Sequence, residues 1–272
     1  MLTQAKHLVG SWLVRHHQTI APLLWDHHAP YRFAGGKIYL NVKESPMMLA
    51  RAFGIYEPLK MGAVRHFLRP GMTFVDVGGN KGDFALLAAH VTGKQGSVLC
   101  FEPEPQNCDW IRKSIDLNRY ANVTLYEMAL SDRSGAAQLY LGRKSGWHTL
   151  LSGQEKSDAG TITVQTTTLD GIVQSESVKS VDVMKIDVEG AELQVLNGAQ
   201  ATLAANQNIV LLIDVHPKMG VKPQEVASLL ASRGFGVYRM QPPFDKLAVI
   251  ADDLRELVAY RKPSENFGFK AA

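Results

Sequence analysis

The chain has 272 residues, of which 46% are hydrophobic, and a formal net charge of +3 at pH 7. This composition is sufficient for a large hydrophobic core, while a small net charge from scattered lysines and arginines argues against nucleic acid as a partner. Two cysteines cannot build a disulfide framework, no apolar run approaches the roughly 20 residues that cross a membrane, and no secretion signal is recognisable, so we expect a cytoplasmic protein.

Residues 1–70 are expected to form an N-terminal helical extension, or cap. Apolar residues recur at helical spacing over residues 1–35, and residues 37–42 are typical of a short strand. Residues 47–69 have helical periodicity again, with one interruption near Gly54 and Pro58.

Residues 71–272 are expected to form one α/β domain. Strand and helix patterns alternate, which predicts a mostly parallel seven-stranded sheet with helices on both faces. The alternation breaks at an insertion of about 135–167, whose two extended segments are expected to pair as a β-hairpin. The predicted strands are 73–77, 97–101, 123–129, 181–188, 209–215, 236–240 and 257–261, and the predicted helices are 84–91, 106–118, 191–204 and 223–233.

The most informative stretch is 74–83, Phe-Val-Asp-Val-Gly-Gly-Asn-Lys-Gly-Asp, which has the strand, glycine turn and helix of a nucleotide-type cofactor site. Its glycines do not have the spacing of a dinucleotide fingerprint, whether counted from Gly78 or from Gly79. We expect Asp76 to face the ligand, where a carboxylate repels a pyrophosphate and attracts a cation. S-adenosylmethionine (SAM), with an ammonium, a sulfonium and no phosphate, fits this site.

Further cofactor contacts are predicted at the ends of the next two strands, because open sheets of this kind bind ligands at the carboxyl ends of their strands. Glu102 ends the second strand, where a carboxylate accepts hydrogen bonds from both ribose hydroxyls. Met128 and Ala129 end the third strand and are expected to flank the adenine.

These residues resemble those of FkbM-type SAM-dependent methyltransferases. The resemblance covers about residues 54–217 and implies a Rossmann-like methyltransferase fold with an antiparallel last strand, SAM as donor and a hydroxyl as the usual acceptor. It also implies that Glu57 folds over the methionine end of SAM, and Gly79 stands where many members have alanine. The matching segments are Tyr56-Glu57, Phe74–Gly82, Phe101–Pro103, Ala129–Asp132, Thr168–Asp170, Lys185–Glu192 and His216, and the cofactor residues carried over are Asp76, Gly78, Asn80, Gly82 and Glu102.

The predicted catalytic residues follow the fourth and fifth core strands. Methyl transfer to an alcohol is helped by a base near the methyl group, and His216, which ordinarily titrates near neutral pH, is the predicted base. Asp187 and Glu189 are expected to orient it or to bind the acceptor, and Asp187 also to border the cofactor. Simple capping of the next helix is the alternative for these acids. A divalent metal held by the same three residues is a second hypothesis, but their spacing is not a diagnostic metal signature.

The leading interpretation is a SAM-dependent O-methyltransferase acting on a hydroxyl of a sugar, glycolipid or secondary metabolite, with the acceptor class taken from the resemblance. The insertion residues 145–149, Ser-Gly-Trp-His-Thr, are expected to form part of an acceptor lid, or else a solvent-exposed hairpin tip. The alternatives are an N-methyltransferase, which lacks support because no Asn/Asp-Pro-Pro-Tyr/Phe follows the fourth strand, a non-catalytic SAM-binding protein, and a nicotinamide dehydrogenase.

Overall fold

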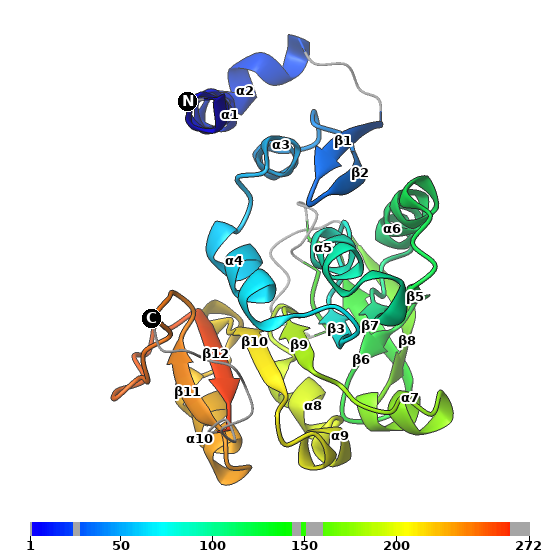
Figure 1. Cartoon of the computed structure of the whole chain (residues 1–272), viewed down its shortest axis with the longest axis vertical. Coiled ribbons are helices and arrows are strands. Elements are labelled where there is room, and N and C mark those ends of the chain that lie inside the picture. Colours follow the sequence, from blue (N-terminus) through cyan, green and yellow to red (C-terminus); the bar gives the residue numbers. More distant parts are fainter. Residues whose placement is uncertain (1, 24–27, 143–147, 151–159, 262–272) are drawn as a thin grey trace.

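The computed structural model describes residues 2–23, 28–142, 148–150 and 160–261. Its centre is a seven-stranded sheet of β3 (Thr73–Val77), β4 (Ser97–Phe101), β5 (Val123–Tyr126), β9 (Val183–Ile186), β10 (Val210–Asp214), β11 (Gly236–Arg239) and β12 (Glu256–Tyr260). The strands lie in the order β11-β12-β10-β9-β3-β4-β5 (Figure 1). Only β12 is antiparallel to its neighbours β10 and β11 in this sheet. The expected mostly parallel sheet with an antiparallel last strand is therefore confirmed.

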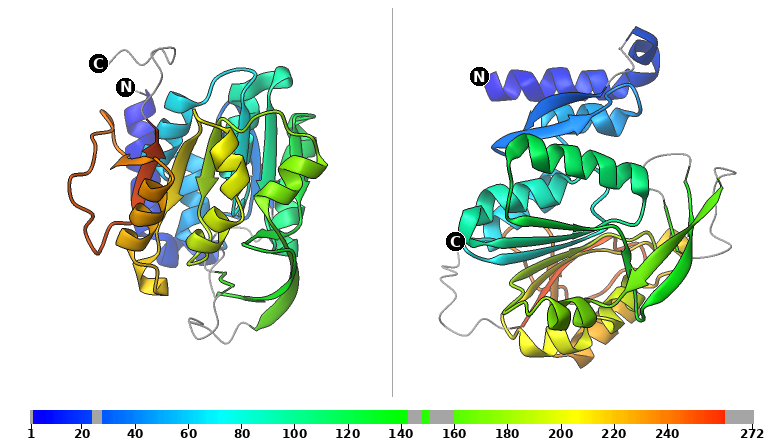
Figure 2. Two further views of the ribbon diagram at one scale, coloured as in Figure 1. Left: turned by 90° about the horizontal axis from the view of Figure 1, so that it is seen from below. Right: turned by 90° about the vertical axis from the view of Figure 1, so that its right-hand side faces the viewer.

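Helices cover both faces of the sheet, as the right-hand view of Figure 2 shows. One face is covered by α5 (Asp83–Thr92) and α6 (Pro105–Asn118), and the other by α7 (Leu169–Ser175), α8 (Glu192–Asn197), α9 (Gln200–Ala205) and α10 (Pro223–Ser232). Successive side chains of a strand point alternately into two hydrophobic cores. In β3, Phe74 packs on the α5 side, whereas Val75 and Val77 pack on the α8 side. Two short 3-10 turns, Gly93–Gln95 and Pro217–Met219, complete this unit.

The N-terminal extension differs in part from the expected helical cap. It contains α1 (Leu2–Arg15), α2 (His17–Ile20), a 3-10 turn (Ala21–Leu23), β1 (Ala29–Phe33), β2 (Gly36–Leu40), α3 (Pro46–Phe53) and α4 (Pro58–Phe67). The expectation of helix throughout residues 1–35 is wrong for β1, which pairs antiparallel with β2. This hairpin lies on α6, where the Tyr39 N–H donates to Ser114 Oγ at 3.0 Å. Ile38 and Leu40 are buried in the same core as α5, and the domain boundary near residue 70 stays a prediction.

Besides the central sheet and the β1–β2 pair there is a three-stranded sheet, in which β7 (Gly135–Tyr140) and β8 (Thr161–Thr167) of the insertion join β6 (Ala129–Leu130). Strands β7 and β8 pair antiparallel, which confirms the predicted hairpin. The predicted third core strand over 123–129 is too long, since β5 ends at Tyr126 and β6 pairs with β8 instead. The sheet thus extends beyond the hairpin, and its residues Ala129, Leu130 and Leu139 line a cavity at the edge of the central sheet.

Candidate functional site

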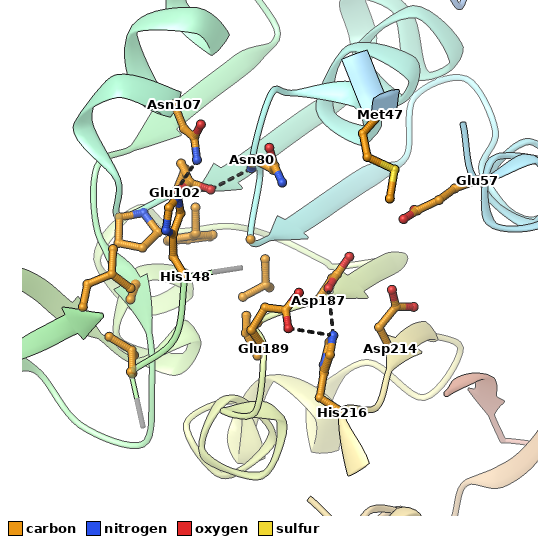
Figure 3. A pocket seen from close by; sticks show the side chains of 18 of the residues that line it. Met47, Glu57, Asn80, Glu102, Asn107, His148, Asp187, Glu189, Asp214 and His216 are labelled. Atoms are coloured by element: carbon orange, nitrogen blue, oxygen red, sulfur yellow. Dashed lines mark hydrogen bonds and ion pairs between the residues drawn. The ribbon is translucent and has the colours of Figure 1, made fainter. Parts of the chain in front are cut away.

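A cavity of about 460 Å³ opens at the carboxyl ends of β3, β4, β9 and β10. Figure 3 shows two clusters of polar side chains in it: Asn80, Glu102, Asn107 and His148 at one end, and Glu57, Asp187, Glu189, Asp214 and His216 at the other. The first end is formed by the glycine turn and β4, and the second is rich in carboxylates. Apolar residues that line the same cavity include Phe101, Ala129, Leu130, Leu139, Leu150 and Val188.

Two glycines of the turn after β3, Gly78 and Gly79, have no room for a side chain. Gly78 has a φ of +81°, and a Cβ on this residue would lie 2.0 Å from the backbone oxygen of Asp187. A Cβ on Gly79 would lie 2.6 Å from Cys100 Sγ. Gly82, with a φ of +89°, precedes the first turn of α5. Gly78 and Asn80 of this turn line the cavity, where the backbone of Gly78 permits close approach of a ligand, whereas the predicted cofactor residues Gly79 and Gly82 are not among the lining residues.

Glu102 lies at the end of β4, is 5% exposed and lines the cavity. Its carboxylate accepts hydrogen bonds from the Asn80 N–H at 2.6 Å, the Glu104 N–H at 3.0 Å and Asn107 Nδ2 at 3.3 Å. Burial outweighs these bonds and raises the pKa of Glu102 to about 7. The carboxylate is thus fixed in place at the position predicted for ribose recognition, and its charge is sensitive to pH near neutrality.

Asp76 does not face the cavity as we expected. It is fully buried, and its Oδ1 lies 3.3 Å from Lys185 Nζ, which also donates to the Gly78 carbonyl oxygen at 2.7 Å. The reason is strand alternation: Asp76 points to the same side of β3 as Phe74, and Lys185 is its register partner on β9. Asp76 therefore supports the glycine turn through Lys185 and is not among the residues that line the cavity.

Of the two residues expected beside the adenine, only one lines the cavity. Ala129 lines the cavity, together with its neighbour Leu130. Met128 is not among the lining residues and packs instead against the core on the α8 side of the sheet. Because β5 ends at Tyr126, the chain turns into β6 before the predicted position, so that Ala129 and Leu130 reach the cavity.

The carboxylate-rich end of the cavity is held by Lys60 of α4. Its Nζ lies 2.9 Å from Glu57 Oε2 and 3.6 Å from Asp187 Oδ2, and it forms a short contact with Asp214. Although burial raises the pKa of Asp187, the cations of Lys60, Lys185 and His216 lower it on balance. Burial and the charge of Asp187 raise the pKa of Asp214. Of these two carboxyl groups, Asp187 is therefore the one whose negative charge the surrounding cations favour more strongly.

His216 stands among three carboxylates. Its Nδ1 lies 2.6 Å from Oε1 of the fully buried Glu192, while Nε2 faces the cavity, 3.5 Å from Glu189 and 3.7 Å from Asp187. Burial lowers the pKa of His216, but the hydrogen bond to Glu192 and the charges of Glu189 and Asp187 raise it to about 9. This differs from the expectation that His216 titrates near neutral pH, because the surrounding carboxylates favour the protonated imidazole.

The orienting partner of His216 is Glu192 and not Asp187 or Glu189. Glu192 Oε1 also accepts the Gly190 N–H at 3.0 Å, which fixes the carboxylate at the start of α8. Since Glu192 holds Nδ1, the other ring nitrogen is directed to the cavity. The sequence signal for this role was the final acid of the Lys185–Glu192 segment, whereas nothing in the sequence pointed to Lys60.

Two groups of three residues bring ligand atoms within 4.8 Å of one another: Asp187, Glu189 and His216, and Glu57, Asp187 and Asp214. In the second group the Lys60 ammonium contacts all three carboxylates. In the first, the His216 imidazolium accounts for the approach of the two acids. Ion pairing thus explains both clusters, and the metal hypothesis stays untested.

The insertion contributes to the cavity through His148, which lines it, and Leu150. Thr149 Oγ1 donates to the Glu189 backbone oxygen at 2.7 Å and so joins the insertion to the loop after β9. The remaining residues of the predicted lid, including Trp147, lie outside the described part of the chain.

Comparison with known proteins agrees with this architecture. The methyltransferase FkbM domain matches residues 76–237, more than half of the chain. The chain belongs to the FkbM methyltransferase family. Within the part of this family member that the structure describes, no helix has the length and apolar character needed to span a bilayer.

Three curated relatives illustrate the range of the family. The hexuronic acid methyltransferase AglP of Haloferax volcanii is 30% identical over 57% of this chain and 60% of its own length. The 2-O-methyltransferase NoeI of Sinorhizobium fredii is 30% identical over 52% of this chain and 63% of its own length. The 31-O-demethyl-FK506 methyltransferase FkbM of Streptomyces tacrolimicus is 26% identical over 65% and 77%. The chain therefore matches somewhat under two thirds of the first two relatives.

Solved structures are more distant. A SAM-dependent methyltransferase from Aquifex aeolicus superposes with a TM-score of 0.43 at 14% identity, over 74% of this chain and 87% of that one.

Proposed function

We propose that this protein is a SAM-dependent O-methyltransferase that methylates a hydroxyl group of a sugar, glycolipid or secondary metabolite. The observation that carries the proposal is the placement of His216. Its Nε2 faces the cavity while Glu192 holds Nδ1 at 2.6 Å, and the glycine turn borders the same cavity. The names of the relatives support an oxygen acceptor, since two of them specify O-methylation or an O-demethyl substrate.

The cavity fits SAM on three counts. The glycine turn presents the backbone of Gly78 to the cavity, and a side chain is excluded at this position because its Cβ would lie 2.0 Å from the Asp187 backbone oxygen. Glu102 offers a fixed carboxylate suited to ribose hydroxyls. The opposite end of the cavity gathers Glu57, Asp187, Glu189 and Asp214, a surplus of acids that favours a cationic ligand. Bound SAM supplies a methyl group on a positively charged sulfur.

In the proposed reaction an oxygen–methyl bond forms as the sulfur–methyl bond breaks, and the hydroxyl proton passes to His216 Nε2. Glu192 stabilises the imidazolium that results and keeps Nε2 directed at the cavity. For this role His216 must first lose the proton that its three carboxylates favour. A cation bound at the same end of the cavity lowers the pKa of His216 and so promotes that loss.

Two measurements test the proposal in sequence. Isothermal titration should show binding of SAM and no comparable binding of NADH. Incubation with pools of hydroxylated metabolites and glycolipids should then give methylated products with the wild type, whereas His216→Gln should bind SAM and lose turnover by about 10²–10⁴-fold. SAM binding without methyl transfer to any acceptor would favour a non-catalytic binding protein, and methylation at nitrogen would favour an N-methyltransferase.

A further inference from the structure

Lys60 is a charged residue in the interior of the protein. Its side chain is 1% exposed, and it is among the largest fully buried side chains of the described chain. Helix α4 places it behind the cavity, beside Phe84 of α5, whose ring centroid lies 5.5 Å from Nζ. A lysine in such surroundings is retained only where acidic partners compensate the loss of water.

The three partners of Lys60 come from three separate elements. Glu57 precedes α4 and has a left-handed φ of +41°, Asp187 follows β9, and Asp214 ends β10. All three line the cavity, whereas Lys60 lies behind them and is not a lining residue. One buried ammonium thus connects the N-terminal extension with the ends of two core strands, at the end of the cavity where His216 stands.

We propose that Lys60 is a positioning residue that draws Glu57, Asp187 and Asp214 together and balances the negative charge that acts on His216. This inference rests on the proposed function for its catalytic meaning. The contact passes through Asp187, whose Oδ2 lies 3.6 Å from Lys60 Nζ and whose Oδ1 lies 3.7 Å from His216 Nε2.

The sign of the effect follows from the groups around His216. Without the Lys60 cation the surroundings become more negative, and the pKa of His216 rises. A higher pKa makes a neutral imidazole scarcer at neutral pH, so Lys60 favours the form of His216 that accepts a proton. The charged groups on the elements around His216 are Asp187, Glu189 and Glu192 after β9, Lys185 on β9, Asp214 on β10, Lys218 beside it, Arg255 before β12 and Lys60 on α4.

The test is an NMR titration of the His216 ring in Lys60→Met, which keeps the aliphatic stem and removes the charge. The His216 signals are assigned by their loss in His216→Asn. We expect the pKa of His216 to rise by roughly one pH unit, the order expected for a unit charge two ion pairs away. An unchanged or lower value in a folded Lys60→Met protein would overturn the proposal.

Because three carboxylates without a cation can prevent folding, the comparison is repeated in a second background. Asp214→Asn removes one carboxylate, and Lys60→Met is then added to it. The double variant should have a His216 pKa about one pH unit above that of Asp214→Asn, and equal values would contradict the role of Lys60. The matched control is Lys222→Met, at a side chain that is 74% exposed, which should leave the titration unchanged.

A kinetic readout separates positioning from a purely structural role. Once an acceptor is known, the acidic limb of the pH profile of kcat/KM should move upward in Lys60→Met by the same amount as the NMR value. The NMR titration needs neither SAM nor an acceptor, so failure of the proposed methyl transfer and failure of the Lys60 proposal would be observed separately.

Discussion

The substitution Glu192→Gln should weaken the pH dependence of folding stability. In the wild type the pKa of His216 is raised from 6.5 to about 9, a difference of about 2.5 pH units, or about 3 kcal/mol. Solvent screening reduces this free energy only slightly, since the His216 side chain is only 19% exposed. Because the folded pKa lies above the unfolded one, this stabilisation is complete below pH 6.5 and is lost as the pH rises through about 9.

Among the groups that raise the pKa of His216, Glu192 contributes most, through its hydrogen bond, ahead of the charges of Glu189 and Asp187. A glutamine keeps a hydrogen-bond acceptor for Nδ1–H and removes the charge. Between neutral and alkaline pH, we therefore expect Glu192→Gln to lose about 1–2 kcal/mol less stability than the wild type.

The assay is urea denaturation followed by circular dichroism, at several pH values from about 6 to about 10. His216→Asn serves as the reference that lacks the titrating ring and should remove the whole contribution in this range. If Glu192→Gln lost as much stability with rising pH as the wild type, Glu192 would have no part in binding the proton, contrary to this prediction.

Three further predictions concern the rest of the cavity. Since the pKa of Glu102 is about 7, SAM affinity should fall as the pH drops below 7, and Glu102→Gln should remove this dependence in calorimetric titrations. Gly78→Ala should abolish SAM binding and lower thermal stability, because its Cβ would lie 2.0 Å from a backbone oxygen; tight SAM binding by this variant would contradict the close-approach argument. Methyl transfer should survive exhaustive chelation, and loss of turnover that Mg²⁺ or Mn²⁺ restores would revive the metal hypothesis.

Local sequence patterns predicted the sheet well, because each core strand carries an apolar run bounded by turn residues. Strands β3 and β4 match their predicted ranges, 73–77 and 97–101. Strand β1 was missed, because its five residues begin Ala-Pro and include only two aromatic residues, a weak β signal. The third strand was predicted too long, since a continuous apolar pattern does not reveal that the chain changes sheets between Tyr126 and Ala129.

The site was predicted less completely, because its geometry depends on partners far apart in the sequence. The strand-end rule brought Glu102, Asp187 and His216 to one cavity. It also placed Asp76 there, although the alternation of β3 turns that side chain toward Lys185. The contact between Lys60 and Asp214 joins residues 154 positions apart, so that no local motif contains both.

The most direct test of the account is the position of a labelled methyl group. The protein is incubated with SAM that carries a deuterated methyl group and with pools of hydroxylated acceptors, and the products are located by mass spectrometry and NMR. We predict a trideuteromethyl ether on an acceptor oxygen, formed by the wild type and not by His216→Gln. Label on nitrogen or carbon, or ether formation that continues undiminished without the imidazole, would contradict the account.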